Sequence, residues 1–220
     1  MIDIHAPHET VHTWRDFFIH VATICVGLLI AVALEQSVEL LHRHHEIVET
    51  REHIRDEVQL NQRVAREDKQ HMVELTARLN HDLDLVNAAG TPQQDSNAMI
   101  DFTWNLQNFF DASYNGAKSS GVLARMPSEE TDAYGDMYTG VTISTDAMID
   151  LIKQIYAAEE ILHNRRLADL PRGQLAALQA SLSSAVAKAK YYKLVIDLES
   201  QELNATFANH YRTDVSGAGR

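Results

Sequence analysis

Residues 17–34 read FFIHVATICVGLLIAVAL, the longest apolar run in the chain. As an α-helix these 18 residues extend about 27 Å at about 1.5 Å per residue, close to the hydrocarbon thickness of a bilayer. Polar residues resume at Glu35, and Trp14 stands where aromatic residues gather at a membrane interface. The run therefore predicts a transmembrane helix over residues 17–41, preceded by a short polar tail at 1–16.

Two other structures share this apolar composition and fit the run less well. A cleaved signal peptide begins with basic residues, whereas the start MIDIHAPHETVHTW is not basic. A buried core helix of a soluble protein has a polar face, and this run has none. The side of the membrane stays open, because the count of flanking arginines favours a cytoplasmic bundle by only a small difference: Arg15 before the run, and Arg43, Arg51 and Arg55 after it.

The amino-acid composition of the rest of the chain favours helices. Only four prolines and nine glycines interrupt 220 residues, and good helix formers dominate. The composition predicts an all-α protein with one N-terminal transmembrane helix followed by an elongated three- to four-helix antiparallel bundle. We expect the bundle over residues 42–212 and a flexible tail over 213–220.

Three long segments carry apolar residues at spacings of three and four, which is typical of amphipathic helices in a bundle. We expect these helices over residues 42–86, over 128–170 after the start signal at Pro127, and over 174–211. The expected buried stripes are, in order, Ile47, Ile54, Val58, Ala65, Met72, Leu75, Leu79 and Val86; Tyr138, Val141, Thr145, Met148, Ile152, Ile155, Glu159 and Leu162; and Leu175, Leu178, Leu182, Ala185, Ala189, Tyr192 and Val195.

Shorter elements are expected between the first two long helices. Residues 88–97 (AAGTPQQDSN) read as a loop, with Asp95 or Ser96 as a cap for the next helix. The asparagine–glycine pair at 115–116 predicts a turn, and 118–125 a short helical piece. The helix expected between loop and turn carries apolar side chains at helical spacing: Met99, Phe102, Leu106, Phe109 and Phe110.

Histidines cluster directly after the transmembrane segment. On a helix His42, His45, Glu46 and Glu49 share one face, and imidazole with carboxylate at this spacing binds zinc or another divalent ion. The same residues also suit a polar collar at the level of the lipid headgroups. We treat them as candidate metal ligands, and we expect no resident cofactor.

Aromatic residues concentrate between residues 102 and 114. Such a group either lines a pocket for an apolar ligand or closes the open end of a bundle with large side chains. The candidate pocket residues are Phe102, Trp104, Phe109, Phe110 and Tyr114.

Small residues recur along one face of the transmembrane segment. Thr23, Gly27 and Ala31 stand four residues apart, which allows two membrane helices to approach closely. The spacing predicts a helix–helix contact, most simply in a homodimer.

Charge and motifs limit the function classes. A formal net charge of -12 repels phosphate backbones, so we expect no nucleic-acid partner. The sequence has no nucleophile elbow and no glycine-rich phosphate loop, and its single cysteine, Cys25, lies in the apolar run. We therefore expect no catalytic residues and no enzyme.

Several stretches resemble a group of bacterial single-pass membrane proteins that share a Trp-Arg-Asp-Phe start and a Gly-Leu-Leu-Ile-Ala core. The resemblance implies a Gram-negative bacterial source and an anchor in the inner membrane. It implies no activity and no functional residues, because none is assigned to the group. The matching residues are His12 to His20, Gly27 to Ala31, Leu34, Glu35, Ser120 to Leu123, Met126, Pro127 and Tyr134 to Tyr138.

These observations favour a membrane-anchored helical scaffold or protein-interaction module that associates with itself and with an unidentified protein partner. The alternative is a ligand- or metal-binding sensory module that acts through a partner. It requires a partner because this sequence has one transmembrane segment and no output domain.

Overall fold

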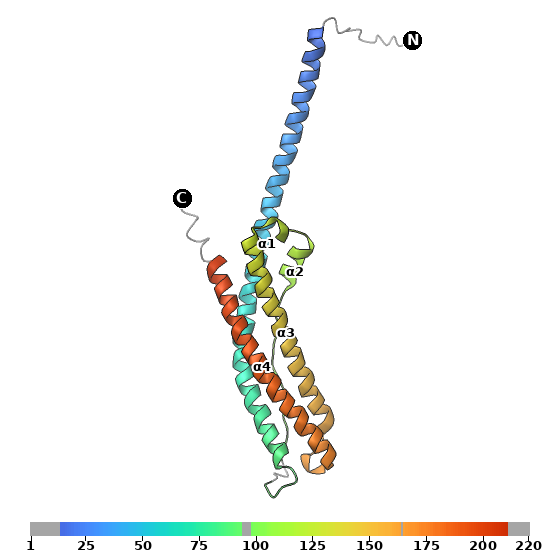
Figure 1. Ribbon diagram of the computed structural model, residues 1–220, viewed down its shortest axis with the longest axis vertical. Coiled ribbons are helices and arrows are strands. Elements are labelled where there is room, and N and C mark those ends of the chain that lie inside the picture. The colour runs from blue at the N-terminus through green and yellow to red at the C-terminus, as the bar shows by residue number, and fades with distance from the viewer. Residues whose placement is uncertain (1–13, 94–97, 164, 211–220) are drawn as a thin grey trace, which may run out of the picture. The chain divides into compact units, whose positions relative to one another are not determined.

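The protein is all-helical, as the composition predicts (Figure 1). The computed structural model describes residues 14–93, 98–163 and 165–210, and every regular element in these ranges is a helix. The elements in chain order are α1 (Trp14–Ala88), α2 (Ala112–Ser119), the 3-10 turn η1 (Leu123–Arg125), α3 (Ser128–Leu162), the 3-10 turn η2 (Leu167–Asp169) and α4 (Arg172–His210).

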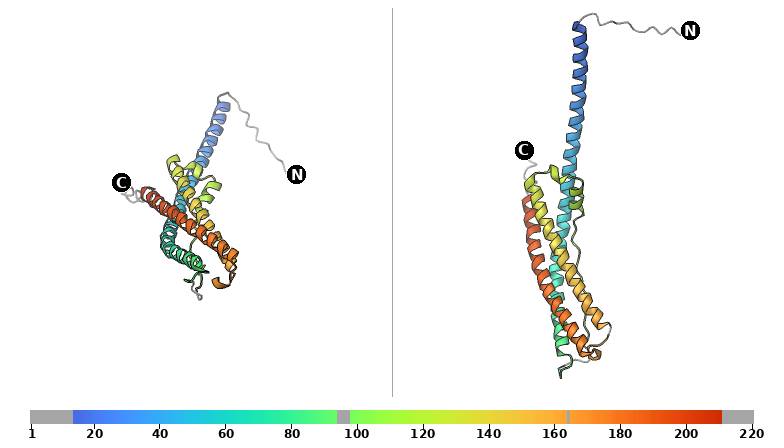
Figure 2. Two further views of the ribbon diagram at one scale, coloured as in Figure 1. Left: turned by 60° about the horizontal axis from the view of Figure 1, so that its bottom comes forward. Right: turned by 45° about the vertical axis from the view of Figure 1, so that its right-hand side comes forward.

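The chain divides into two compact units, Met1–Val48 and Glu49–Arg220, and α1 contributes residues to both. In the first unit, residues 14–45 are all exposed. In the second unit, the remaining part of α1 packs with α3 and α4. Figures 1 and 2 show α4 running antiparallel to both other helices of this bundle.

The predicted stripes form the core of the second unit. From Ile54 to Val86, every stripe residue of α1 is at most 4% exposed. In α3 and α4 the stripes are buried along most of their length, whereas Thr145, Ile152, Glu159 and Leu175 remain partly or fully exposed. The period of three and four therefore located the core because it is the period of a packed helix face.

Residues 98–111 are not helical, so the helix predicted here was wrong. The segment crosses the bundle as an extended chain, antiparallel to α1 (Figure 2). From 98 to 106, the even-numbered residues turn inward and the odd-numbered ones face solvent, which is the period of an extended strand. Met99, Phe102, Leu106 and Phe109 are also spaced by three and four, and this spacing led to the helix prediction.

Helix ends also differ from prediction. The pair at 115–116 lies inside α2, where the sequence predicted a turn. Helix α3 ends at Leu162, eight residues before the predicted limit, because His163 adopts a left-handed conformation with φ 45° and donates its N–H to Glu159 O at 2.8 Å. Helix α4 begins directly after Pro171, which suits a first turn that needs no N–H donor. The capping residues proposed at 95 and 96 lie outside the described residues.

Candidate functional site

The N-terminal part of α1 presents apolar side chains on all sides. One helix among the described residues is long and apolar enough to cross a membrane, and none of its most apolar window is buried within the chain. Phe18, Leu29 and Leu41 are each more than 60% exposed. This surface is too large and continuous to be stable in water.

Thr23, Gly27 and Ala31, which we call the small-residue ridge, lie on this part of α1. The Thr23 hydroxyl donates to Ile19 O at 2.9 Å, so it needs no partner from another helix. A Cβ atom at Gly27 would meet no atom within 4 Å, which leaves a shallow notch in the helix surface. Together with Ala31 these small side chains would let another helix approach closely along this face. The predicted helix–helix contact stays a prediction.

The candidate metal ligands lie on α1 in exposed positions. His42 Nε2 is 3.4 Å from Glu46 Oε1, an ion pair when the imidazole is protonated. His45 and Glu49 are also exposed. Across the part of the chain that the structure describes, no group of three or more His, Cys, Asp or Glu side chains is arranged to hold a metal ion. Metal binding therefore stays a prediction that rests on spacing.

Polar side chains of α1 hold the extended segment by its main chain. Asn61 donates to Phe110 O at 2.7 Å and accepts from Phe110 N at 2.8 Å. The Asn61 contacts replace the internal hydrogen bonds that a helix makes, because buried main-chain groups require partners. Directly after the segment, the Glu57 carboxylate accepts from Ser113 N at 2.8 Å and from Tyr114 N at 3.3 Å, two N–H groups in the first turn of α2.

The same arrangement continues toward the end of α1. Asp68 accepts from Gln107 N at 3.0 and 3.2 Å, and Arg78 donates to Thr103 O at 2.7 Å. From Asn61 to Arg78 a helix rises about 26 Å at about 1.5 Å per residue. From Thr103 to Phe110 an extended chain covers about 23 Å at about 3.3 Å per residue. The two lengths are similar, so successive side chains of α1 can reach successive main-chain groups of the segment. We call the contacts of Asn61, Asp68 and Arg78 with this main chain the polar ladder.

Asp68 also joins the ladder to α4. The Tyr192 hydroxyl donates to Asp68 Oδ2 at 2.7 Å, and both side chains are fully buried. Burial raises the pKa of Asp68, and the hydrogen bonds from Tyr192 and Gln107 N partly oppose that rise. Nearer the end of α1, burial raises the pKa of Asp82 to about 6. The sequence showed these acids among apolar stripe residues without indicating which groups they bind.

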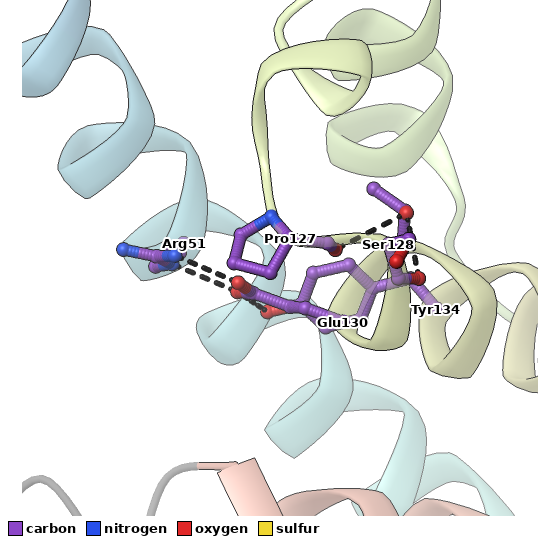
Figure 3. A network of polar contacts seen from close by, with 6 residues as sticks. Arg51, Pro127, Ser128, Glu130 and Tyr134 are labelled. Atoms are coloured by element: carbon purple, nitrogen blue, oxygen red, sulfur yellow. Dashed lines mark hydrogen bonds and ion pairs between the residues drawn. The ribbon is translucent and has the colours of Figure 1, made fainter.

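An ion pair joins α1 to the start of α3. Arg51 donates through Nε and Nη2 to the two carboxylate oxygens of Glu130, at 2.8 and 2.7 Å. The Tyr134 hydroxyl donates to Glu130 Oε1 at 2.9 Å, and Figure 3 shows the three side chains converging. The arrangement anchors the first turn of α3 after Pro127.

Glu199 is buried between α3 and α4 without a cation. The residue is 2% exposed, and its Oε1 has no hydrogen-bond partner among the described residues. The carboxyl group packs against Gly140 of α3, where any Cβ atom would overlap Glu199 Oε2. Burial, and secondarily the nearby charge of Glu202, raise the pKa of Glu199 to about 8. A protonated carboxyl group is therefore the stable form near neutral pH.

The predicted aromatic group separates into two places. Phe102 and Trp104 line a cavity beside the C-terminal half of α3. Tyr114 stacks on Tyr138 with ring centroids 4.3 Å apart, and Phe109 is buried in the core. Phe110 is exposed. Only two of the five residues thus line this cavity, because an extended chain places Phe102 and Phe110 about 26 Å apart at about 3.3 Å per residue and Tyr114 lies in α2.

Helix α4 carries a second apolar stripe that faces away from the core. Tyr191, Leu194 and Leu198 are each more than half exposed and stand at a helical spacing of three and four. Tyr191 and Ile143 of α3 line one groove between α3 and α4, which is rimmed by the charged side chains of Asp146, Asp150, Lys153 and Lys188. The spacing of three and four predicted only the inner stripe of α4, although the outer stripe has the same period.

Comparisons with protein-family models, with curated proteins and with solved structures give no match to this chain.

Proposed function

We propose that this protein is a membrane-anchored helical interaction module that associates with itself and serves a non-catalytic role. The observation that carries the proposal is the fully exposed apolar part of α1, residues 17–34, whose length matches the hydrocarbon core of a bilayer. A bilayer removes this surface from water, and no packing within the chain does so. The bacterial inner membrane is the proposed location.

Self-association is supported by two separate surfaces. The ridge of Thr23, Gly27 and Ala31 suits close helix–helix packing in lipid. The outer stripe of α4, formed by Tyr191, Leu194 and Leu198, is an apolar patch beside charged residues, as in many protein interfaces. A two-fold axis would bring each surface against its own copy.

Membrane anchoring is tested by fractionation of cells that express the full chain. We expect the protein in the membrane pellet after a carbonate wash, and a soluble protein would contradict the proposal. Fusions of alkaline phosphatase and of green fluorescent protein to the C-terminus then report the side of the bundle. Phosphatase activity indicates the periplasm, and fluorescence indicates the cytoplasm.

Self-association is tested by light scattering of the full chain in mild detergent at micromolar concentration. We expect a dimer mass for the wild type. A Leu194→Glu/Leu198→Glu variant removes the outer stripe of α4, and Gly27→Leu widens the ridge, so each reports on one surface. Val73→Glu is the matched control, since Val73 of α1 is 59% exposed, compared with 58% for Leu198. A strictly monomeric wild type would show that self-association is wrong.

A further inference from the structure

A half-open cavity of about 730 Å³ lies in the second unit beside the C-terminal half of α3. Its volume is in the range of about 300 to 1,000 Å³ that is typical of small-molecule sites. The extended segment forms one wall and α3 with η2 forms the other. The apolar lining includes Ile100, Phe102, Trp104, Leu162 and Leu167.

The cavity follows from the extended segment. A helix with its side chains is about 10 Å across, whereas an extended chain needs only about 5 Å beside its neighbour. A single extended chain therefore leaves volume unfilled where a fourth helix would pack. The inward residues Ile100, Phe102 and Trp104 face this space and remain only half-buried.

Aromatic rings form the wall best suited to a planar ligand. The rings of Trp104 and Tyr156 meet edge to face, with centroids 6.2 Å apart and an angle of 85° between their planes. Phe102 lies on the same side of the segment as Trp104, two residues away. Aromatic pairs of this geometry accept another ring by stacking or by an edge contact.

One cationic group in the lining remains available to an acceptor. Arg165 donates through Nε to Leu162 O at 3.3 Å and through Nη2 to Ile161 O at 2.8 Å, which holds its guanidinium group at the end of α3 and leaves Nη1 for another partner. The neighbouring Arg166 pairs with Asp169 at 3.1 Å.

Two acids also line the cavity. Hydrogen bonds from the Thr103 side chain and from Thr103 N at 2.9 Å lower the pKa of Asp101, and its ion pair with Arg78 at 3.4 Å adds to this effect. Glu159 lies one turn before the end of α3 and faces the same cavity as the two arginines. Because Asp101 is paired with Arg78 and Arg166 with Asp169, Arg165 is the cationic group of the lining that can bind an anionic group of a ligand.

We propose that this cavity binds a small aromatic carboxylate, with the ring against Trp104 and Tyr156 and the carboxylate on Arg165. The binding is independent of membrane anchoring and of self-association. Tyr156 is 53% exposed, so its removal leaves the fold intact while it deletes one side of the aromatic wall. Val73 of α1, 59% exposed, lies outside the cavity and outside both proposed self-association surfaces, so it provides the control.

The test uses the full chain in lipid nanodiscs and 1-naphthoate as the probe, followed by titration calorimetry with empty nanodiscs as the blank. We expect saturable binding by the wild type and by Val73→Ala. Tyr156→Ala should weaken binding by about three- to tenfold, the value of one aromatic pair. Circular dichroism and the thermal midpoint report whether each variant is folded.

The role of Arg165 is tested by a change of ligand. Arg165→Gln should weaken 1-naphthoate by about tenfold or more and leave the uncharged 1-naphthalenemethanol within about twofold. Arg63→Gln, at an exposed site on α1, is the control. Equal binding of 1-naphthoate by wild type, Tyr156→Ala and empty nanodiscs would overturn the proposed site. An equal loss of both ligands in Arg165→Gln would overturn the carboxylate contact.

Discussion

Helix α3 and the extended segment 98–111 both run along the bundle, but their main-chain N–H and C=O groups find hydrogen-bond partners in different ways. Helix α3 satisfies its main chain internally, so its neighbours need only apolar surface. Among the described residues the extended segment pairs with no strand, and the polar ladder of α1 binds its main chain at Thr103, Gln107 and Phe110. The difference teaches that polar residues inside an apolar stripe can specify the conformation of a neighbouring segment.

The largest effect is expected from breaking the ladder at Asp68. Asp68→Ala leaves the Gln107 N–H and the Tyr192 hydroxyl without their acceptor in a buried site, and we expect a loss of about 4 kcal/mol in the free energy of unfolding. Urea denaturation followed by circular dichroism measures it. Ser144→Ala on α3 is the control, because the buried Ser144 hydroxyl has no hydrogen-bond partner in the described structure. A loss below about 1 kcal/mol for Asp68→Ala would show that the ladder is not needed.

Glu199 sharpens the comparison, since it is a buried acid between two helices and lacks the N–H donors that Asp68 has. Its pKa rises from an ordinary 4.5 to about 8, so the folded state binds more protons than the unfolded state between these values. Stability should therefore fall as the pH rises from about 4.5 to about 8, and level off above. Glu199→Gln should remove most of this slope above about pH 6, where Asp82 no longer contributes, and stabilise the protein at pH 8 by about 4 kcal/mol.

Urea midpoints measured from pH 5 to pH 9 check the prediction for Glu199. Glu202→Gln is the control, because Glu202 is exposed and only adds its charge to the site. A variant Glu199→Gln that keeps the wild-type slope would assign the pH dependence to other groups.

A smaller effect on stability is expected at Gly140, which packs against the carboxyl group of Glu199. Gly140→Ala places a Cβ atom on Glu199 Oε2, and we expect a net loss of about 1 to 2 kcal/mol after the gain in helix propensity. Gly135→Ala, on the same helix, meets only Tyr114 Oη at 3.8 Å and should stabilise α3 by up to about 1 kcal/mol. Thermal unfolding of the two variants side by side measures both signs. Equal stabilisation would mean that the Glu199 carboxyl group moves aside freely.

The smallest effect on stability is expected from the two ion pairs that join α3 to its neighbouring helices. Arg51→Ala removes the two-bond contact with Glu130, and partial exposure to solvent limits the loss to about 1 kcal/mol. Lys188→Ala, at the more exposed pair with Asp150, should change the free energy of unfolding by less than about 0.5 kcal/mol. Urea denaturation at low and high salt distinguishes the two, because only the first pair is bidentate and shielded.

The sequence by itself determined the apolar helix at residues 17–41, the all-helical class and most of the core. Each of these follows from local periodicity or composition, which persists whatever the neighbours are. The start of α3 after Pro127 was also readable, since proline before a run of acids is a local signal. The outer stripe of α4 also has a helical spacing in the sequence, but the inner stripe has more apolar residues and alone was predicted.

Only the tertiary structure decided the conformation of residues 98–111 and, with it, the cavity. Apolar residues there obey two periods at once: Phe102 and Leu106 fit a helix with Met99 and Phe109, and fit a strand with Ile100 and Trp104. The choice depends on whether the main chain finds hydrogen-bond partners, and those partners lie on α1, between 25 and 49 residues away in sequence. Hydrogen bonds over such separations leave no local pattern, so the extended segment, the separated aromatic group and the buried Glu199 required the folded bundle to be seen.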